Sequence, residues 1–371
     1  MRPTVAPCLA GASRHWVGDG SRGETSVVLR RRDVVPDIIR SLVRVADGAA
    51  HGLIVKDLNA WIRLEFLGVV ARTGVAEALR RPRTLDELLG ETALTDSDLL
   101  EALLALGISL REIRFLRGRY RARGRRLRAI AGSSPDLRGV AEELVVYANR
   151  AYADMDSHLR GAPAVAYDAD CGAAVAAGSR IAEPILGPAV RAVSRREDPQ
   201  RVLDIGCGSG AYLRHMLAAA PTARGLGIDR DAGAIRIASD LLEPLRASGR
   251  CELQQGDIEQ LAEEIGDFDL VTLLNNIYYW PPERRSEILR TIREVIAAGG
   301  VLMLATATTK GHAFNRHLDL MVRVTVSSHR FPTRQEICAD LADAGYIDIE
   351  TIEPVPKTGL LVVIARNPTL R

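Results

Sequence analysis

The second half of the chain alternates short apolar runs with longer amphipathic stretches. The apolar runs predict strands, and they fall at Arg201–Ile205, Gly225–Ile228, Glu252–Gln255, Leu270–Leu274 and Val301–Ala305. The amphipathic stretches predict helices, and they fall near 210–219, 231–246, 258–264, 283–297 and 333–344. Strands that alternate with helices of this length predict a parallel sheet with helices on both faces.

Two further apolar runs close the chain, at Ile347–Ile352 and Leu360–Ala365. Only a short join containing Pro354, Pro356 and Gly359 separates them, and parallel strands need a much longer crossover. These two strands are therefore predicted to be antiparallel, which brings the predicted sheet to seven strands.

The first half has helical periodicity instead. Leu42, Val45 and Ala46 share one helical face, and Thr84 with Glu87 has the spacing of a capping box at a helix start. A helix over Leu99–Leu106 follows, and then a strand-like stretch that turns at Gly118. Three helices followed by a short hairpin are the sequence outline of a winged helix.

A length of 371 residues favours two domains. The pattern predicts a flexible tail over 1–33, a winged-helix-like domain over 34–134, a helical connector over 135–198 and an α/β domain over 199–371. The connector is rich in alanine and interrupted by prolines.

The first predicted strand of the α/β domain runs into a glycine-rich loop, Asp204-Ile205-Gly206-Cys207-Gly208-Ser209-Gly210. Glycines let the backbone turn sharply there and approach a ligand closely. The helix after the loop offers free N–H groups that suit a carboxylate or a phosphate. Gly206, Gly208 and Ala211 also satisfy the looser dinucleotide pattern, so an NAD-dependent oxidoreductase is one alternative.

Carboxylates at successive strand ends favour a different cofactor. Asp204 precedes the first glycine, where it can bond the amino group of an amino-acid ligand. Asp229 ends the second strand, where a carboxylate can bind both ribose hydroxyls. Asp257 follows the third strand and can take an adenine amino group, while Ile258 can cover the ring.

With these residues, 200–366 resembles the class I S-adenosylmethionine (SAM)-dependent methyltransferases, whose Rossmann-like sheet has seven strands with an antiparallel final pair. The resemblance implies that Asp204, Gly206, Gly208 and Asp229 surround the methionine and ribose of SAM, with Gly210 closing the loop. It also implies that Asp257 and Ile258 lie at the adenine.

The whole chain resembles a narrower group, the small-molecule O-methyltransferases with an N-terminal winged-helix dimerisation domain. Trp280-Pro281-Pro282-Glu283 corresponds to their His-Asp-Trp-Ser-Asp-Glu segment, whose histidine is the general base. Tyr278 stands at that position here, and a tyrosine with a pKa near ~10 is a poor base at neutral pH. Tyr278 can instead orient an acceptor, with His312 as the candidate base and Asn275 as a contact of cofactor or acceptor.

The resemblance implies methylation of a small-molecule acceptor, for which secondary metabolism is the expected setting, by in-line transfer. O-methylation is the first choice, and N- or C-methylation is an alternative because methyl transfer needs little proton movement when the acceptor is already nucleophilic. A homodimer formed through the N-terminal domain is also implied.

Composition narrows the class of protein further. A net charge of +2 does not indicate steering to nucleic acid or an acidic membrane, no apolar run has membrane-spanning length, and no signal peptide is visible. Five scattered cysteines fit a reducing cytoplasm, and no cluster has metal-ligand spacing.

Arginines are concentrated in the predicted hairpin region. They are Arg111, Arg114, Arg117, Arg119, Arg121, Arg123, Arg125, Arg126 and Arg128. On a winged helix such a cluster can bind phosphates, so a nucleic-acid-binding SAM-dependent methyltransferase or regulator is another alternative. A solvated wing or the rim of a dimer interface is the favoured interpretation, and nucleic-acid binding is not.

Overall fold

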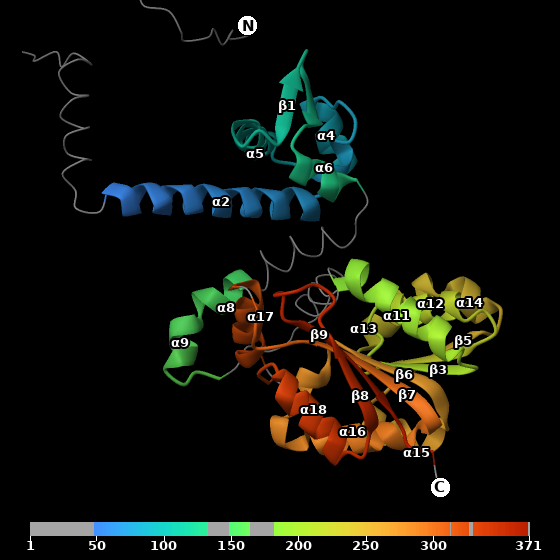
Figure 1. Cartoon of the computed structure of the whole chain (residues 1–371). Helices are drawn as coiled ribbons and strands as arrows, with labels where there is room; N and C mark the ends of the chain where they lie inside the picture. The colour runs from blue at the N-terminus through green and yellow to red at the C-terminus, as the bar shows by residue number, and fades with distance from the viewer. Residues whose placement is uncertain (1–47, 133–147, 164–181, 312, 326–328, 370–371) are drawn as a thin grey trace, which may run out of the picture. The chain divides into compact units, whose positions relative to one another are not determined.

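A computed structural model describes residues 48–132, 148–163, 182–311, 313–325 and 329–369 (Figure 1). The chain divides into two compact units, Met1–Asn59 and Ala60–Arg371. The predicted tail over 1–33 lies outside the described residues. No helix in the described part of the chain has the length and hydropathy of a membrane-spanning segment.

The first described elements follow the expected order of helices and then a hairpin. They are α2 (Gly48–Arg72), α3 (Val75–Ala78), α4 (Leu85–Thr92), α5 (Ser97–Ser109), β1 (Ile113–Leu116), β2 (Arg119–Ala122) and α6 (Arg125–Ala131). The capping box at the start of α4 is confirmed, because Thr84 accepts from the Glu87 N–H and Glu87 accepts from the Thr84 N–H. Phe66, Leu79 and Leu104 are fully buried in the core of this region.

The β1–β2 hairpin carries many of the arginines, and several have internal partners. Arg119 donates to Glu87 and to the Pro82 carbonyl, while Arg126 lies 3.7 Å from the buried Glu112. Glu112 also accepts from the Leu127 N–H. Arg119 therefore ties the hairpin to the start of α4, and Arg126 of α6 pairs with the residue just before β1.

Three described helices follow α6 along the chain before the first strand of the sheet, and they are α8 (Asn149–Ala153), α9 (Met155–Leu159) and α11 (Glu183–Glu197). Ala148 and Ala151, at the start of α8, pack on Met321 and Val324. Helix α11 packs on the sheet as part of the α/β domain. Its buried face contacts the helix that follows the first strand.

The seven strands are β3 (Arg201–Ile205), β4 (Arg224–Asp229), β5 (Cys251–Gln255), β6 (Phe268–Leu274), β7 (Ile296–Ala307), β8 (Ile347–Ile352) and β9 (Leu360–Arg366). They lie in the order β5-β4-β3-β6-β7-β9-β8, and every pair is parallel except the two that β9 makes. The predicted seven-stranded sheet with an antiparallel final pair is confirmed.

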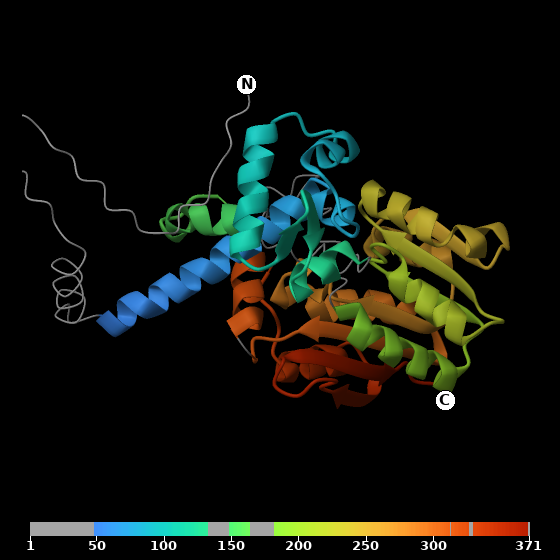
Figure 2. The same cartoon turned by 90° about the horizontal axis from the view of Figure 1, so that it is seen from above.

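The sheet is buried on both faces because its strands are almost continuously apolar. Leu203 and Ile205 of β3 point into one core, with α15 (Ile258–Ile265), α16 (Arg285–Glu294) and α18 (Arg334–Asp343). Val202 points into the other core, with α11, α12 (Ala211–Ala219) and α13 (Ala232–Leu241). The three layers can be followed in Figures 1 and 2.

Two elements differ from the sequence prediction. The helix expected over 231–246 breaks at Leu242 into α13 and α14 (Glu243–Ala247), with Pro244 in the first turn of the second helix. The stretch between β7 and α18 contains an unpredicted helix, α17 (Ala313–Arg323).

Candidate functional site

The chemistry-bearing residues predicted from the sequence gather where four neighbouring strands end. The order of the strands reverses at β3. The chain continues from β3 to β4 and β5 on one side of it, and then returns to β6 on the other side. Such a reversal in an open α/β sheet leaves a crevice outside the carboxyl ends of the strands, where ligands bind. Asp257, Asp229, Gly206 and Asn275 follow or end these four strands.

Gly206, Gly208 and Gly210 all have left-handed backbone conformations, with φ of 64°, 54° and 77°. A side chain at Gly206 would collide with the amide nitrogen of Asn276, and one at Gly210 would reach Leu242 at 2.7 Å. A side chain at Gly208 would meet no atom within 4 Å. A side chain at Gly206 or Gly210 would thus displace a neighbouring side chain, whereas Gly208 leaves open space beside the loop.

Asp229 ties the end of β4 to the glycine loop. Its Oδ2 accepts from the Gly208 N–H at 2.9 Å and its Oδ1 accepts from the Asp231 N–H at 2.9 Å. The carboxylate is half-buried, so it stays partly accessible at the sheet edge. Each oxygen has further lone pairs with which to accept from ligand hydroxyls.

Asp204 lies inside the fold beneath this loop, with 1% of its surface exposed. Its Oδ1 accepts from the Thr272 hydroxyl at 2.6 Å, and its Oδ2 has no hydrogen-bond partner among the described residues. Burial raises the pKa of Asp204 to about 7. The predicted contact of Asp204 with a ligand amino group stays a prediction, since the carboxyl group is enclosed here.

Asp257 caps α15, where its Oδ1 accepts from the Glu259 N–H at 3.2 Å. Its Oδ2 lies 3.7 Å from Arg230, whose guanidinium carbon lies 5.9 Å from the centre of the Tyr279 ring. Ile258 is 1% exposed and packs in the sheet core. The adenine contacts predicted for Asp257 and Ile258 are untested by this geometry and stay predictions.

Asn275 and Asn276 follow β6 and have different roles. Asn275 adopts a left-handed φ of 59°, and its N–H donates to the Ala305 carbonyl at 2.7 Å. The Asn276 side chain is buried and donates to the Ile205 carbonyl at 2.6 Å. Asn276 thereby anchors the glycine loop. Nothing in the sequence indicates that Asn276, rather than Asn275, makes this contact.

Aromatic rings gather beyond these asparagines. Tyr278 lies in a single 3₁₀ turn, with its ring centre 4.9 Å from that of Tyr279 and 5.1 Å from that of Phe331. The His329 N–H donates to the Tyr278 carbonyl at 2.8 Å. Tyr278 therefore contacts the segment before α18, and His312 lies outside the described residues.

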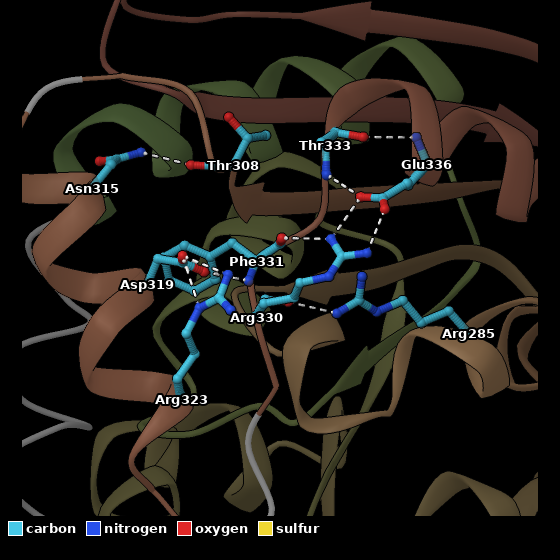
Figure 3. Close-up of polar contacts among 9 residues, drawn as sticks. All are labelled: Arg285, Thr308, Asn315, Asp319, Arg323, Arg330, Phe331, Thr333 and Glu336. Carbon is cyan, nitrogen blue, oxygen red and sulfur yellow. Dashed lines mark hydrogen bonds and ion pairs between the residues drawn. The ribbon is translucent and has the colours of Figure 1, made fainter. Parts of the chain in front are cut away.

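A charged network surrounds that segment (Figure 3). Arg330 bonds both carboxylate oxygens of Glu336, and this partner holds the pKa of Glu336 down at about 2. Arg285 and Asp319 bond the backbone of 330–331 from α16 and α17. Burial lowers the pKa of Arg285. Sequence reasoning missed Arg285, because it belongs to no motif.

His317 on α17 contacts Tyr152 of the connector. Its Nδ1 lies 3.0 Å from the Tyr152 hydroxyl, and the two rings stack with their centres 5.6 Å apart. Burial lowers the pKa of His317. The described residues contain no group of three or more His, Cys, Asp or Glu side chains placed to hold a metal ion.

The sheet order, the glycine loop and the strand-end carboxylates define a class I methyltransferase fold. Residues 202–300, from β3 into β7, match the family model described as a methyltransferase domain. These residues contain the glycine loop, Asp229, Asp257 and Tyr278.

The sequence is similar to the phenazine-1-carboxylate N-methyltransferase of Pseudomonas aeruginosa, with 30% identity over 172 residues. That match covers 44% of this chain and 48% of the relative, so this chain spans about half the length of the curated protein.

Solved structures match over more of the chain. The mitomycin 7-O-methyltransferase MmcR has a TM-score of 0.70 at 20% identity, covering 87% of this chain and 99% of its own. Human N-acetylserotonin methyltransferase, solved in complex with SAM, has a TM-score of 0.69 at 15% identity, covering 86% and 98%. At these identities, the likeness shows the fold, including the N-terminal helical part.

Proposed function

We propose that this protein is a SAM-dependent methyltransferase that transfers a methyl group to a small-molecule acceptor of secondary metabolism. The observation that carries the proposal is the join between Asp229 and Gly208, which sets a carboxylate beside an open, side-chain-free stretch of backbone at the sheet edge. The match of residues 202–300 to the methyltransferase domain supports it.

The residues at this edge fit the cofactor. Asp229 would accept from the ribose hydroxyls, Gly208 leaves room for close approach, and Asp257 lies at the adjacent strand end for the adenine. When bound, SAM supplies a methyl group on an electrophilic sulfonium. The protein's own contribution is to hold the acceptor in line, and such orientation can contribute on the order of 7–11 kcal/mol.

O-methylation is the first choice because of the family resemblance, and a phenol or an enol-like carbon is the kind of acceptor that would suit a site without a strong base. Tyr278 and Tyr279 are partly exposed and form an aromatic surface, backed by the buried Phe331, against which a planar acceptor can stack. Tyr278 would orient the acceptor hydroxyl, and His312 is the candidate base. N-methylation is the second candidate, because the relative that is 30% identical is an N-methyltransferase.

A homodimer formed through the N-terminal helices is part of the proposal. Helix α2 leaves several large apolar side chains exposed, namely Leu53, Ile54, Leu58, Trp61 and Leu64. Exposed apolar surface of this kind marks an interaction site. Light scattering of the purified protein should give twice the mass of one chain. We also propose that the protein acts in the cytoplasm, because its scattered cysteines fit a reducing compartment.

Calorimetry with SAM, its demethylated product and NAD tests the cofactor directly. We expect SAM and the demethylated product to bind and NAD not to bind. Asp229→Ala should weaken SAM binding by about 10- to 100-fold, because the ribose loses a charge-assisted partner. Asp231→Ala is the matched control, since Asp231 caps α13 through the Gly233 and Ala234 N–H groups and should keep its SAM affinity.

Binding of NAD without SAM would overturn the proposal in favour of an oxidoreductase. A gel shift with duplex DNA at physiological salt would support the nucleic-acid alternative. The acceptor is best sought by incubating the protein with labelled SAM and metabolites from its genomic neighbourhood.

A further inference from the structure

The segment from His329 to Phe331 lies directly against Tyr278. The His329 N–H donates to the Tyr278 carbonyl at 2.8 Å, and the Phe331 ring meets the Tyr278 ring edge-on with centres 5.1 Å apart. Phe331 is only 3% exposed. The orientation of Tyr278 is therefore coupled to the position of this segment.

Asp319 holds the segment from the side of α17. Its Oδ1 accepts from the Phe331 N–H at 2.8 Å, and its Oδ2 pairs with Arg323 at 3.0 Å. The Asp319 carboxylate is nearly enclosed, at 7% exposure. The two oxygens therefore have different partners, and only Oδ1 contacts the segment.

Arg285 holds the same segment from α16, and Figure 3 shows the two residues reaching it from opposite sides. Arg285 Nη2 donates to the Arg330 carbonyl at 2.7 Å. The side chain is 1% exposed, yet its Nε and Nη1 have no acceptor among the described residues. Buried N–H groups without partners oppose folding, so Arg285 is a poor choice for stability alone.

We propose that Arg285 and Asp319 are positioning residues, which clamp Arg330 and Phe331 against Tyr278 and so fix the aromatic surface offered to the methyl acceptor. This inference rests on the proposed function, because it assigns the clamped surface to the acceptor. A small displacement of Tyr278 would misalign the acceptor oxygen with the transferred methyl group, and in-line transfer is sensitive to such displacement.

Hydrogen exchange of the whole protein tests the clamp without any acceptor. Asp319→Ala should speed exchange of the Phe331 and His329 amides about tenfold, the factor expected for loss of one such hydrogen bond. If the clamp positions Tyr278, the faster exchange should extend to the amides of Tyr279 and Trp280, which follow it. A purely local role would leave those two amides unchanged and would overturn the proposal.

Two variants separate the oxygens of Asp319. Asp319→Asn keeps an acceptor for the Phe331 N–H and should retain wild-type exchange at Tyr279 and Trp280. Arg323→Gln removes the ion pair alone and should behave in the same way. If Asp319→Asn were as fast as Asp319→Ala, the charge rather than the hydrogen bond would matter, and the clamp would be refuted.

Arg285→Met distinguishes positioning from structural support. It removes the donor to Arg330 together with the two unpartnered N–H groups, so the melting temperature should be unchanged or higher. Exchange at Phe331 and Tyr279 should nevertheless rise about tenfold. A lower melting temperature with unchanged exchange at these amides would show that Arg285 only supports the fold.

The outcomes are independent of those for the proposed function. SAM affinity should be the same in all four variants, because none of them touches the glycine loop. If wild-type protein failed to bind SAM, the proposed function would fall while the exchange data still reported on the clamp. Normal SAM binding with unchanged exchange in Asp319→Ala and Arg285→Met would overturn the clamp alone.

Discussion

The sheet edge proposed to bind the cofactor and the aromatic side proposed to face the acceptor are built in different ways. At the cofactor edge, the central contacts use backbone groups, as where Asp229 accepts from the Gly208 N–H and Asn276 donates to the Ile205 carbonyl. On the side proposed for the acceptor, the shape comes from side chains that meet across long stretches of sequence, as where the Tyr278 and Phe331 rings pack edge-on. A backbone-built site needs glycine at fixed positions, whereas a side chain-built site can use many residue combinations.

From this difference we expect the two sides to tolerate substitutions differently. The glycine loop must keep three left-handed conformations that are unfavourable for any residue with a side chain. Tyr278 is held instead by ring packing against Phe331, which requires no special backbone conformation. The sequence therefore identifies the cofactor far better than the acceptor.

The largest expected effect comes from Gly206→Ala. The new methyl group would collide with the Asn276 side chain in a backbone conformation that alanine avoids, so the free energy of unfolding should fall by about 3–5 kcal/mol. SAM binding should be lost as the loop shifts. Chemical denaturation and calorimetry measure the two effects.

Gly208→Ala provides the contrast within the same loop. Its methyl group would meet no protein atom within 4 Å, so the stability loss should be limited to the backbone cost of about 1–2 kcal/mol. SAM affinity should still fall sharply, because the methyl group occupies the approach to the loop. Equal losses of stability in the two variants would contradict the distinction between packing and ligand approach.

The fold was predictable from local pattern for most of the sheet. The strand runs are apolar enough to be buried on both faces, and the short join before β9 requires an antiparallel pair. Helix α17 was missed because part of its buried face, at Met321, packs on Ala148 and Ala151, far away in sequence. The break between α13 and α14 was missed because Pro244 is tolerated in a first helical turn.

The site was predictable where a motif fixes the backbone and not where burial decides the role. The sequence placed Asp204 near the cofactor, but it could not show that the carboxyl group would be 1% exposed. Arg285 follows another arginine at the start of a helix, a setting typical of an exposed cation, yet it is enclosed. Such facts depend on contacts between distant segments, which no periodicity records.

The pH dependence of stability tests the enclosed state of Asp204. Its folded pKa of about 7 lies above the unfolded value near 3.8, so the folded protein binds a proton that the unfolded chain has released between these values. Stability contributed by this group is therefore present below pH ~4 and lost as pH rises toward ~7. In wild type relative to Asp204→Asn, this loss should amount to about 2–4 kcal/mol.

Denaturation of both proteins from pH 4 to pH 8 measures that difference, and it cancels titrations the two share, such as that of His215. A flat difference would mean that Asp204 is ionised in the folded protein as it is in the unfolded chain. SAM affinity of Asp204→Asn decides the second question. A large loss would support the predicted contact with the ligand amino group, and unchanged affinity would assign Asp204 to the interior of the loop.

The smallest expected effect lies on the acceptor side, where Tyr278→Phe removes one hydroxyl and keeps the ring contact with Phe331. If the hydroxyl orients the acceptor, turnover should fall about tenfold, or about 1.4 kcal/mol, with SAM affinity unchanged. Tyr346→Phe is the matched control, because its buried hydroxyl donates to the Leu289 carbonyl in the sheet core and should affect stability rather than turnover. The measurement is methyl transfer from labelled SAM to the acceptor found by screening. Unchanged turnover in Tyr278→Phe would make Tyr278 a packing residue.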